Sequence, residues 1–264
     1  MPKKETITSL QQAKGQRKLT MITAYDALFA SLFAESADMI LVGDSLNMSF
    51  KGAPDTLSVT LDQMIYHTQA VCNGAPDTFV ICDMPFGSIN TKEEALANAV
   101  KVFQETNADA IKIEGGCNRA ELIKHLTDNA IAVMGHIGLL PQSVRSEGGY
   151  KVKGRDEESF EQVLEDAKAV EEAGAFALVI EGVTPNLGAM VTEVVNIPVI
   201  GIGAGNATDG QVLVWSDMLG FFEAFKPKFV KRYLEGAKLV KEAVKNYAQE
   251  VQNGAFPAEE HTYK

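Results

Sequence analysis

The sequence predicts an α/β fold, a single (β/α)8 TIM barrel in which helices surround a closed ring of parallel strands. The chain has 264 residues, a length typical of one such barrel. Short apolar runs, many of them β-branched, alternate with amphipathic stretches, as expected for parallel β/α units. Ionisable side chains end five consecutive runs, which is where this fold builds its active site.

Eight apolar runs are expected to form the strands. Most are separated by a stretch long enough for one helix, so neighbouring strands are expected to run parallel. No repeat, linker or low-complexity tract divides the chain, and residues 1–264 are therefore expected to form one domain. The expected strands are residues 19–24, 39–43, 78–82, 110–113, 131–135, 177–180, 197–202 and 211–215.

Three of the expected helices have clear signals. Thr91 and Glu94 have the spacing of a capping box at a helix start, and Ser159 with Gln162 repeats that spacing. A final long helix is expected from the apolar stripe within residues 230–247. The apolar stripes of these helices are expected to pack against the barrel.

Composition narrows the class of protein. A net charge of −11 argues against binding to nucleic acid or to an anionic membrane surface. Cys72, Cys82 and Cys117 include no CxxC pair, so a disulfide framework is not expected. We find no signal peptide after Met1 and no run of about 18 apolar residues. The sequence therefore predicts a soluble, cytoplasmic protein.

Polar side chains follow the second to the sixth apolar runs, where each strand is expected to end. They are Asp44, Asp83, Glu114, His136 and Glu181. Because the ends of parallel barrel strands meet at one face, these side chains are expected to converge on one mouth. A single acid at such a position often caps the next helix, but several acids beside a lysine indicate a site.

Side-chain alternation along the strands refines this expectation. Lys112 and Glu114 are two residues apart, so both are expected on the same side of the fourth strand. Ile40, Val42 and Asp44 also share one phase, which predicts that Asp44 lies above inward-facing Ile40 and Val42.

The acids of the expected mouth suggest a metal ion. Asp44, Asp83 and Glu114 would raise one another's pKa values unless cations neutralised them, and Lys112 supplies only one positive charge. Oxygen ligands without a Cys or His cluster favour Mg²⁺ or Mn²⁺. A 2-oxo acid can chelate such an ion through its carboxylate and ketone oxygens. The ion would then stabilise an enolate formed beside the ketone.

Two interpretations remain open for several other residues and segments. Glu181 is a candidate general base or a buried structural acid, and His136 either orients substrate or is structural. The Gly-rich residues 201–205 form either a phosphate-binding loop or a close backbone approach. Residues 45–58 and 138–157 are expected to be functional loops, with solvent-exposed connections as the alternative.

An ordered set of short segments runs through the chain. They are residues 23–26 (TAYD), 41–46 (LVGDSL), 110–116 (AIKIEGG), 135–139 (GHIGL), 141–143 (PQS), 148–152 (GGYKV), 197–205 (IPVIGIGAG) and 227–229 (PKF). In these segments, and along nearly its whole length, the chain resembles the ketopantoate hydroxymethyltransferase family, also called 3-methyl-2-oxobutanoate hydroxymethyltransferases. Asn47 departs from the pattern, because a glycine is commoner there.

The resemblance implies a TIM barrel of the phosphoenolpyruvate/pyruvate type. It also implies a reaction of pantothenate (coenzyme A precursor) biosynthesis, in which 5,10-methylenetetrahydrofolate donates a one-carbon unit to 3-methyl-2-oxobutanoate. The product is 2-dehydropantoate, and the expected cofactor is Mg²⁺. The expected partners are these two small molecules and further copies of the chain, assembled as a homodecamer of two five-membered rings.

The resemblance also implies residue roles. Glu181 matches the proton acceptor that removes the C3 proton before the enolate attacks the methylene carbon. The implied metal ligands are Asp44, Asp83 and Glu114. The implied substrate contacts are Asp44, Ser45, Asp83 and Lys112.

Two other functions are compatible with the residues alone. One is a magnesium-dependent lyase or mutase of the isocitrate-lyase type acting on a 2-oxo acid. Such enzymes commonly need a catalytic cysteine in a mobile loop, whereas Cys117 directly follows the fourth expected strand. The other is a non-catalytic barrel that binds a small metabolite, but binding alone requires no base such as Glu181.

Overall fold

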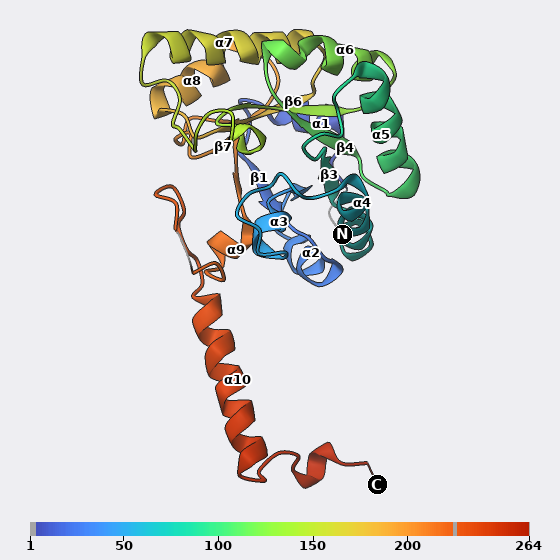
Figure 1. The fold of residues 1–264 in the computed structure, drawn as a ribbon, viewed down its shortest axis with the longest axis vertical. Helices are drawn as coiled ribbons and strands as arrows, with labels where there is room; N and C mark the ends of the chain where they lie inside the picture. The colour runs from blue at the N-terminus through green and yellow to red at the C-terminus, as the bar shows by residue number, and fades with distance from the viewer. Residues whose placement is uncertain (1–3, 224–225, 264) are drawn as a thin grey trace. The chain divides into compact units, whose positions relative to one another are not determined.

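The computed structural model describes residues 4–223 and 226–263. The strands form a closed parallel barrel and are arranged in chain order around it. Figure 1 shows helices outside these strands. All eight predicted strands overlap observed ones, so the prediction of a (β/α)8 barrel is confirmed. The strands are β1 (Leu19–Thr23), β2 (Met39–Val42), β3 (Phe79–Asp83), β4 (Ala110–Glu114), β5 (Val133–Gly138), β6 (Ala177–Glu181), β7 (Val199–Ile202) and β8 (Gly210–Leu213).

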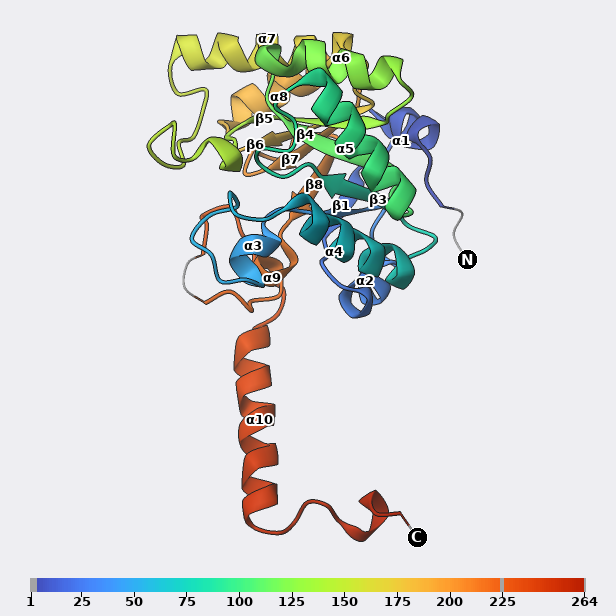
Figure 2. The same ribbon diagram turned by 45° about the vertical axis from the view of Figure 1, so that its right-hand side comes forward.

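Helices follow most strands, and Figure 2 shows α5, α6 and α7 on the outside of the ring. Within the described ranges, no helix has both the length and the apolar character needed to cross a membrane. The described α-helices are α1 (Ile7–Ala13), α2 (Ala27–Phe33), α3 (Leu46–Ser49), α4 (Leu61–Gly74), α5 (Lys92–Glu105), α6 (Ala120–Asp128), α7 (Glu157–Glu172), α8 (Pro185–Val194), α9 (Trp215–Met218) and α10 (Gly236–Gln252). The 3-10 segments are η1 (Cys117–Arg119), η2 (Pro141–Ser143) and η3 (Glu259–His261).

The chain divides into two compact units, Met1–Val214 and Trp215–Lys264. All eight strands belong to the first unit, which is a complete barrel by itself. The second unit contains α9, α10 and η3. A single domain spanning residues 1–264 therefore stays a prediction.

The core of the barrel is filled by the inward-facing side chains of its strands. Leu10 and Ala13 of α1 join this cluster, so α1 closes the end of the barrel at which the strands begin. Parallel pairing sets Leu41 beside Ile81, and both lie in the same cluster. This packing fills one end of the barrel and leaves the other end for polar side chains.

The predicted orientation of β2 is wrong. Met39 and Leu41 belong to the interior cluster, so alternation turns Ile40 and Val42 toward the outside of the barrel. The strand ends at Val42, and Asp44 lies in the turn that follows it. Side chains alternate between the two faces only within the strand. The alternation does not continue through the turn, so the position of Asp44 gave the wrong face for Ile40 and Val42.

The predicted helix starts are partly confirmed. Thr91 caps α5 by accepting the N–H of Glu94, but the Glu94 carboxylate accepts the N–H of Asn90 rather than that of Thr91. Helix α7 begins earlier than predicted, because Asp156 accepts the N–H of Ser159 at 2.8 Å and is the N-cap. An Asp caps as well as a Ser, and here the Asp comes first in the chain.

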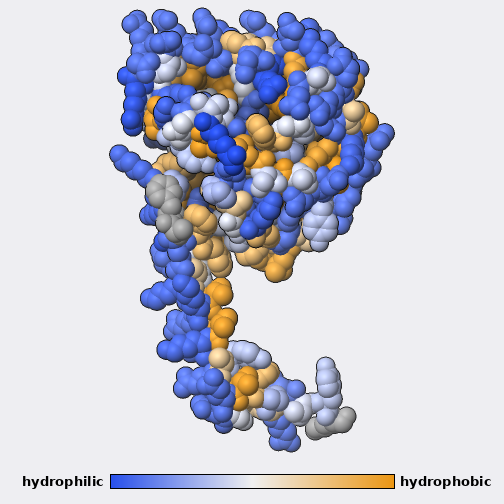
Figure 3. All heavy atoms as spheres, in the orientation of Figure 1, coloured by the Kyte–Doolittle hydropathy of each residue, from blue (hydrophilic) through white to orange (hydrophobic). Residues whose placement is uncertain are grey.

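The final helix begins later than predicted. Tyr233 donates its N–H to the carbonyl of Met218 and Gly236 donates to Leu219, so the chain before α10 is bonded to the segment around α9. One side of α10 is apolar, as the orange atoms along it show in Figure 3. The packing of the predicted stripe against the barrel stays a prediction. Several apolar residues of α10 are about half exposed: Leu239, Val240, Val244, Tyr247 and Val251.

Candidate active site

The strand ends bring ionisable side chains together as predicted. Asp83 is the last residue of β3 and pairs in register with Lys112 of β4. Glu114, the last residue of β4, pairs with His136 of β5, and Glu181 ends β6. Because register partners of parallel strands point to the same face, these side chains line the interior at one end of the barrel.

A buried ion pair lies at the centre of this site. Lys112 Nζ is 2.8 Å from Asp83 Oδ1, and only 4% and 5% of the two side chains are exposed. Asp83 Oδ2 accepts the N–H of Asp44 at 3.0 Å, which fixes the turn after β2. A Cβ at Gly43 would lie 2.8 Å from Ser45 Oγ, so a larger residue there would displace the Ser45 side chain. The Ser45 hydroxyl in turn hydrogen-bonds the Tyr25 hydroxyl at 2.8 Å.

His136 lies between the lysine and the candidate base. Its Nδ1 is 3.0 Å from Lys112 Nζ, and an ammonium group can only donate, so Nδ1 accepts. Burial and then the charge of Lys112 lower the pKa of His136 well below its usual value, so the ring is neutral with its proton on Nε2. That nitrogen lies 3.2 Å from Glu181 Oε2, although the two groups are not aligned for a hydrogen bond.

The site contains more carboxyl groups than ammonium groups. Burial, followed by the charge of Asp83, raises the pKa of Asp44 to about 7. Burial also raises the pKa of Glu114 well above its usual range, against the opposing charge of Lys112. Burial alone would lower the pKa of Lys112, but the surrounding carboxylates, Asp83 first, raise it. Asp44, Asp83 and Glu114 thus share one neighbouring ammonium group, that of Lys112.

The predicted metal ligands do not surround one point in this structure. Among residues 4–223 and 226–263, no group of three or more His, Cys, Asp and Glu side chains is arranged to hold a metal ion. Asp83 is paired with Lys112, while Asp44 and Glu114 are both bonded to Gln142. The metal assignment of the three acids stays a prediction.

Glu181 has the properties expected of a base. Burial raises its pKa to about 7, with the charge of Lys112 opposing the shift. Its side chain is 20% exposed, and no Lys or Arg of the described chain forms an ion pair with it. The backbone holds it in place, since the Glu181 carbonyl accepts the N–H of Leu139 at 2.8 Å. Gly138 permits this approach, because a Cβ there would lie 2.4 Å from the same carbonyl.

Gln142 is a site residue whose contacts were not predicted. Its side-chain amide donates to Asp44 Oδ2 at 2.9 Å and to the Met84 carbonyl at 3.0 Å, and its backbone N–H donates to Glu114 Oε2 at 3.0 Å. The sequence placed it in a loop expected to be functional, but nothing in the loop distinguished this amide from its neighbours.

The two predicted functional loops are linked to each other. Arg145 Nη2 forms an ion pair with Asp55 Oδ2 at 2.8 Å, which joins the loop after β5 to the loop after β2. Burial, followed by the charges of Glu181 and Asp55, raises the pKa of Tyr150, so this phenol lies close to the mouth. The assignment of both segments as functional loops stays a prediction.

The Gly-rich segment at 201–205 is explained by close backbone packing. A Cβ at Gly201 would lie 2.7 Å from Thr208 Oγ1, and one at Gly205 would lie 2.9 Å from the Cβ of Pro185. Gly205 also has a φ of +85°, which disfavours other residues. The contacts of Gly201 and Gly205 therefore account for these two glycines without a phosphate.

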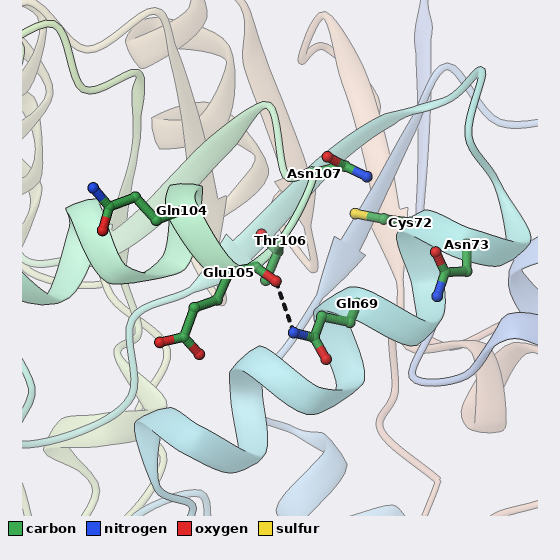
Figure 4. A pocket seen from close by; sticks show the side chains of 7 residues that line it. All are labelled: Gln69, Cys72, Asn73, Gln104, Glu105, Thr106 and Asn107. Atoms are coloured by element: carbon green, nitrogen blue, oxygen red, sulfur yellow. Dashed lines mark hydrogen bonds between the residues drawn. The ribbon is translucent and has the colours of Figure 1, made fainter.

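A cavity of about 280 Å³ lies elsewhere in the barrel unit, near the C-terminal ends of α4 and α5 (Figure 4). These helix ends precede β3 and β4, so the cavity lies beside the strand starts, at the end of the barrel opposite Asp83 and Glu114. Its lining therefore plays no part in the site. It consists of Gln69, Cys72, Asn73, Gln104, Glu105, Thr106 and Asn107.

Comparison with solved structures shows the same fold. A phosphoenolpyruvate phosphomutase from Streptomyces platensis subsp. rosaceus superposes with a TM-score of 0.63 at 12% identity, covering 98% of this chain and 92% of that chain. A 2,3-dimethylmalate lyase of the PEP mutase/isocitrate lyase superfamily gives a TM-score of 0.61 at 16% identity, covering 97% and 91%. The fold and the site define a TIM barrel with an acidic mouth.

Sequence comparison identifies the family. The model of the ketopantoate hydroxymethyltransferase family matches residues 4–259, and the chain belongs to this family of enzymes. A 3-methyl-2-oxobutanoate hydroxymethyltransferase from Aliarcobacter butzleri (strain RM4018) is 66% identical over 98% of this chain and 97% of its own. Another from Sulfurimonas denitrificans (strain ATCC 33889 / DSM 1251) is 65% identical over the full length of both chains. The resemblance stated from the sequence is confirmed.

The central ion pair predicts a large effect on stability. Lys112→Met should lower the free energy of unfolding by about 3–5 kcal/mol, because it leaves the buried Asp83 carboxylate without its partner. Chemical denaturation of the variant measures this loss. Lys124→Met is the matched control, since Lys124 pairs with Asp128 at the same 2.8 Å but in an exposed position. That control should lose at most about 1 kcal/mol, and equal losses in the two variants would refute the central role of the buried pair.

Proposed function

We propose that this enzyme transfers a one-carbon unit from 5,10-methylenetetrahydrofolate to C3 of 3-methyl-2-oxobutanoate. The products are 2-dehydropantoate and tetrahydrofolate, and one water molecule is consumed. The observation that carries the proposal is Glu181, a carboxylate at the acidic mouth that has a raised pKa and no cationic partner among the described residues. The names of full-length relatives supply the substrate.

The residues of the mouth fit a magnesium ion by their chemistry. Asp44, Asp83 and Glu114 offer only carboxylate oxygens, the donors that Mg²⁺ prefers. Burial, with the neighbouring carboxylates, raises the pKa values of Asp44 and Glu114, so a bound cation would favour their ionised forms. We therefore assign these three acids as the groups that would hold Mg²⁺. When bound, the ion would supply Lewis-acid polarisation of the 2-oxo group.

The protein side chains would divide the remaining work. Lys112 would bind the substrate carboxylate, and Ser45, held by the Tyr25 hydroxyl, would donate a hydrogen bond to the substrate. Glu181 would remove the C3 proton, which leaves an enolate whose C3 forms the new bond to the transferred carbon. The neutral His136 keeps the ammonium group of Lys112 away from that base.

The structure disfavours the alternative lyase or mutase that requires a reactive cysteine. Cys117 lies at the start of η1, where burial and then the carboxylate of Asp166 raise the pKa of its thiol. A raised pKa lowers the thiolate fraction and so the reactivity of the thiol. Cys82 faces away from the interior, because it alternates with Ile81 of the core cluster.

We also propose that the enzyme acts in the cytoplasm, in pantothenate biosynthesis, as a homodecamer. The family resemblance supports the assembly. The apolar, half-exposed stripe of α10 is compatible with burial in a contact between copies of the chain.

The proposed reaction can be tested directly. Purified enzyme with 3-methyl-2-oxobutanoate, 5,10-methylenetetrahydrofolate and Mg²⁺ should form 2-dehydropantoate, because it then has both substrates and the expected ion. EDTA should suppress the reaction, and added Mg²⁺ should restore it. Product measured by mass spectrometry decides the outcome. Undiminished turnover after exhaustive chelation would eliminate the metal, and lack of product under all conditions would eliminate the reaction.

The role of Glu181 predicts the loss of one partial reaction. Glu181→Gln should abolish exchange of the C3 proton of 3-methyl-2-oxobutanoate with deuterated water, because a neutral amide cannot accept that proton. The oxo acid should still bind, since Lys112 and the acids of the mouth are unchanged. NMR of the C3 position measures exchange and calorimetry measures binding. Exchange at the wild-type rate would remove Glu181 from the mechanism.

The raised pKa of Glu181 also predicts a pH profile. The base acts only when deprotonated, so kcat/KM should rise about tenfold per pH unit below pH 7 and level off above it. Steady-state rates between about pH 5 and 8 test this, with enzyme stability checked at each pH. A profile that is flat across this range would contradict a Glu181 base with a pKa of about 7.

A further inference from the structure

We infer that Gln142 is a positioning residue, which fixes the orientation of Asp44 and Glu114 so that one oxygen of each remains free for ligands. The inference rests on the proposed function, because it concerns the acids assigned to substrate and metal. Gln142 itself need not touch the substrate. It acts on the two acids from the loop that follows β5.

The contacts of Gln142 join three separate parts of the mouth. Its side-chain amide donates to Asp44 after β2 and to the carbonyl of Met84 after β3, at 2.9 and 3.0 Å. Its backbone N–H donates to Glu114 at the end of β4, at 3.0 Å. Gln142 thus donates three hydrogen bonds, one to a residue at or after the end of each of β2, β3 and β4.

The contacts also select which carboxylate oxygens are occupied. Gln142 donates hydrogen bonds to Oδ2 of Asp44 and to Oε2 of Glu114. The other oxygen of Glu114, Oε1, lies 3.7 Å from His136 Nδ1, on the side of the central ion pair. A carboxylate held through one oxygen cannot rotate freely, so its second oxygen has a defined direction.

Burial makes this orientation depend on few groups. Asp44 is 4% exposed and Glu114 is 8% exposed, so water contributes little to holding them. The carboxylate of Asp44 has no ion pair with a Lys or Arg in the described chain, since Lys112 is paired with Asp83. The side chains of Gln142 and Thr56 both lower the pKa of Asp44, so both act on its carboxyl group. Removal of the Gln142 amide would leave Asp44 buried and less well fixed.

The amide of Gln142 can be removed with little change in size. Gln142→Met keeps the length of the side chain and the backbone N–H but abolishes both side-chain hydrogen bonds. A matched control exists on α7, where the Gln162 amide donates to Asp166 Oδ1 at 3.1 Å at an exposed position. Gln162→Met is therefore the same substitution at an amide–carboxylate contact away from the mouth.

The test measures Mn²⁺ binding to each full-length enzyme by electron paramagnetic resonance, with thermal unfolding recorded alongside. Gln142→Met should weaken Mn²⁺ binding about 10- to 100-fold, the range for groups that orient metal ligands. Its unfolding midpoint in EDTA should fall by only a few degrees, the cost of one lost buried hydrogen-bond donor, and raised Mg²⁺ should restore its kcat. Gln162→Met should behave as wild type in every measurement.

Three results would overturn the inference. Gln142→Met could bind Mn²⁺ within twofold of wild type, which would show that the amide does not orient the ligands. A lowered unfolding midpoint with a kcat that raised Mg²⁺ fails to restore would show a structural role instead. Wild type that binds no Mn²⁺ would overturn both this inference and the metal in the proposed function, and the wild-type measurement separates that case from the first.

Discussion

Lys112 and Asp83 form an ion pair where β3 and β4 end, and both side chains are almost withdrawn from water. Desolvating two charges costs several kcal/mol per ion, so such a pair persists only where further hydrogen bonds support it. Here Asp83 also accepts the N–H of Asp44, and Lys112 also donates to His136. The turn after β2 and the protonation of the histidine therefore both depend on this pair.

The position of most site residues could be predicted from the sequence because the barrel imposes it. Parallel strands in register place their last residues at one end of the barrel. An acid that ends an apolar run is therefore expected at that end. Asp83, Glu114 and Glu181 are the last residues of β3, β4 and β6, as this reasoning requires. The same reasoning gave the wrong orientation for Ile40 and Val42 of β2. Asp44 lies in a turn beyond that strand, so its position does not indicate which way the strand residues point.

The remaining features depend on tertiary contacts that no local pattern encodes. Gln142 bonds Asp44 across 98 residues of chain, and Arg145 pairs with Asp55 across 90. Local signals also compete with one another, as at α7, where Asp156 caps the helix before Ser159 can. The start of α10 is set by hydrogen bonds to residues near α9, so its apolar periodicity extends beyond the helix itself.

The arrangement also explains how Lys112 and Glu181, the proposed base, can share one small site. An ammonium group in contact with Glu181 would stabilise the ionised form of that carboxylate, lower its pKa and weaken it as a base. The imidazole of His136 lies between them and accepts from Lys112 through Nδ1, so Glu181 faces a neutral N–H. Burial then dominates, and the pKa of Glu181 is raised to about 7. In the proposed mechanism, the histidine that the sequence left between two interpretations would keep the proposed base Glu181 strong while Lys112 remains charged for an anionic substrate.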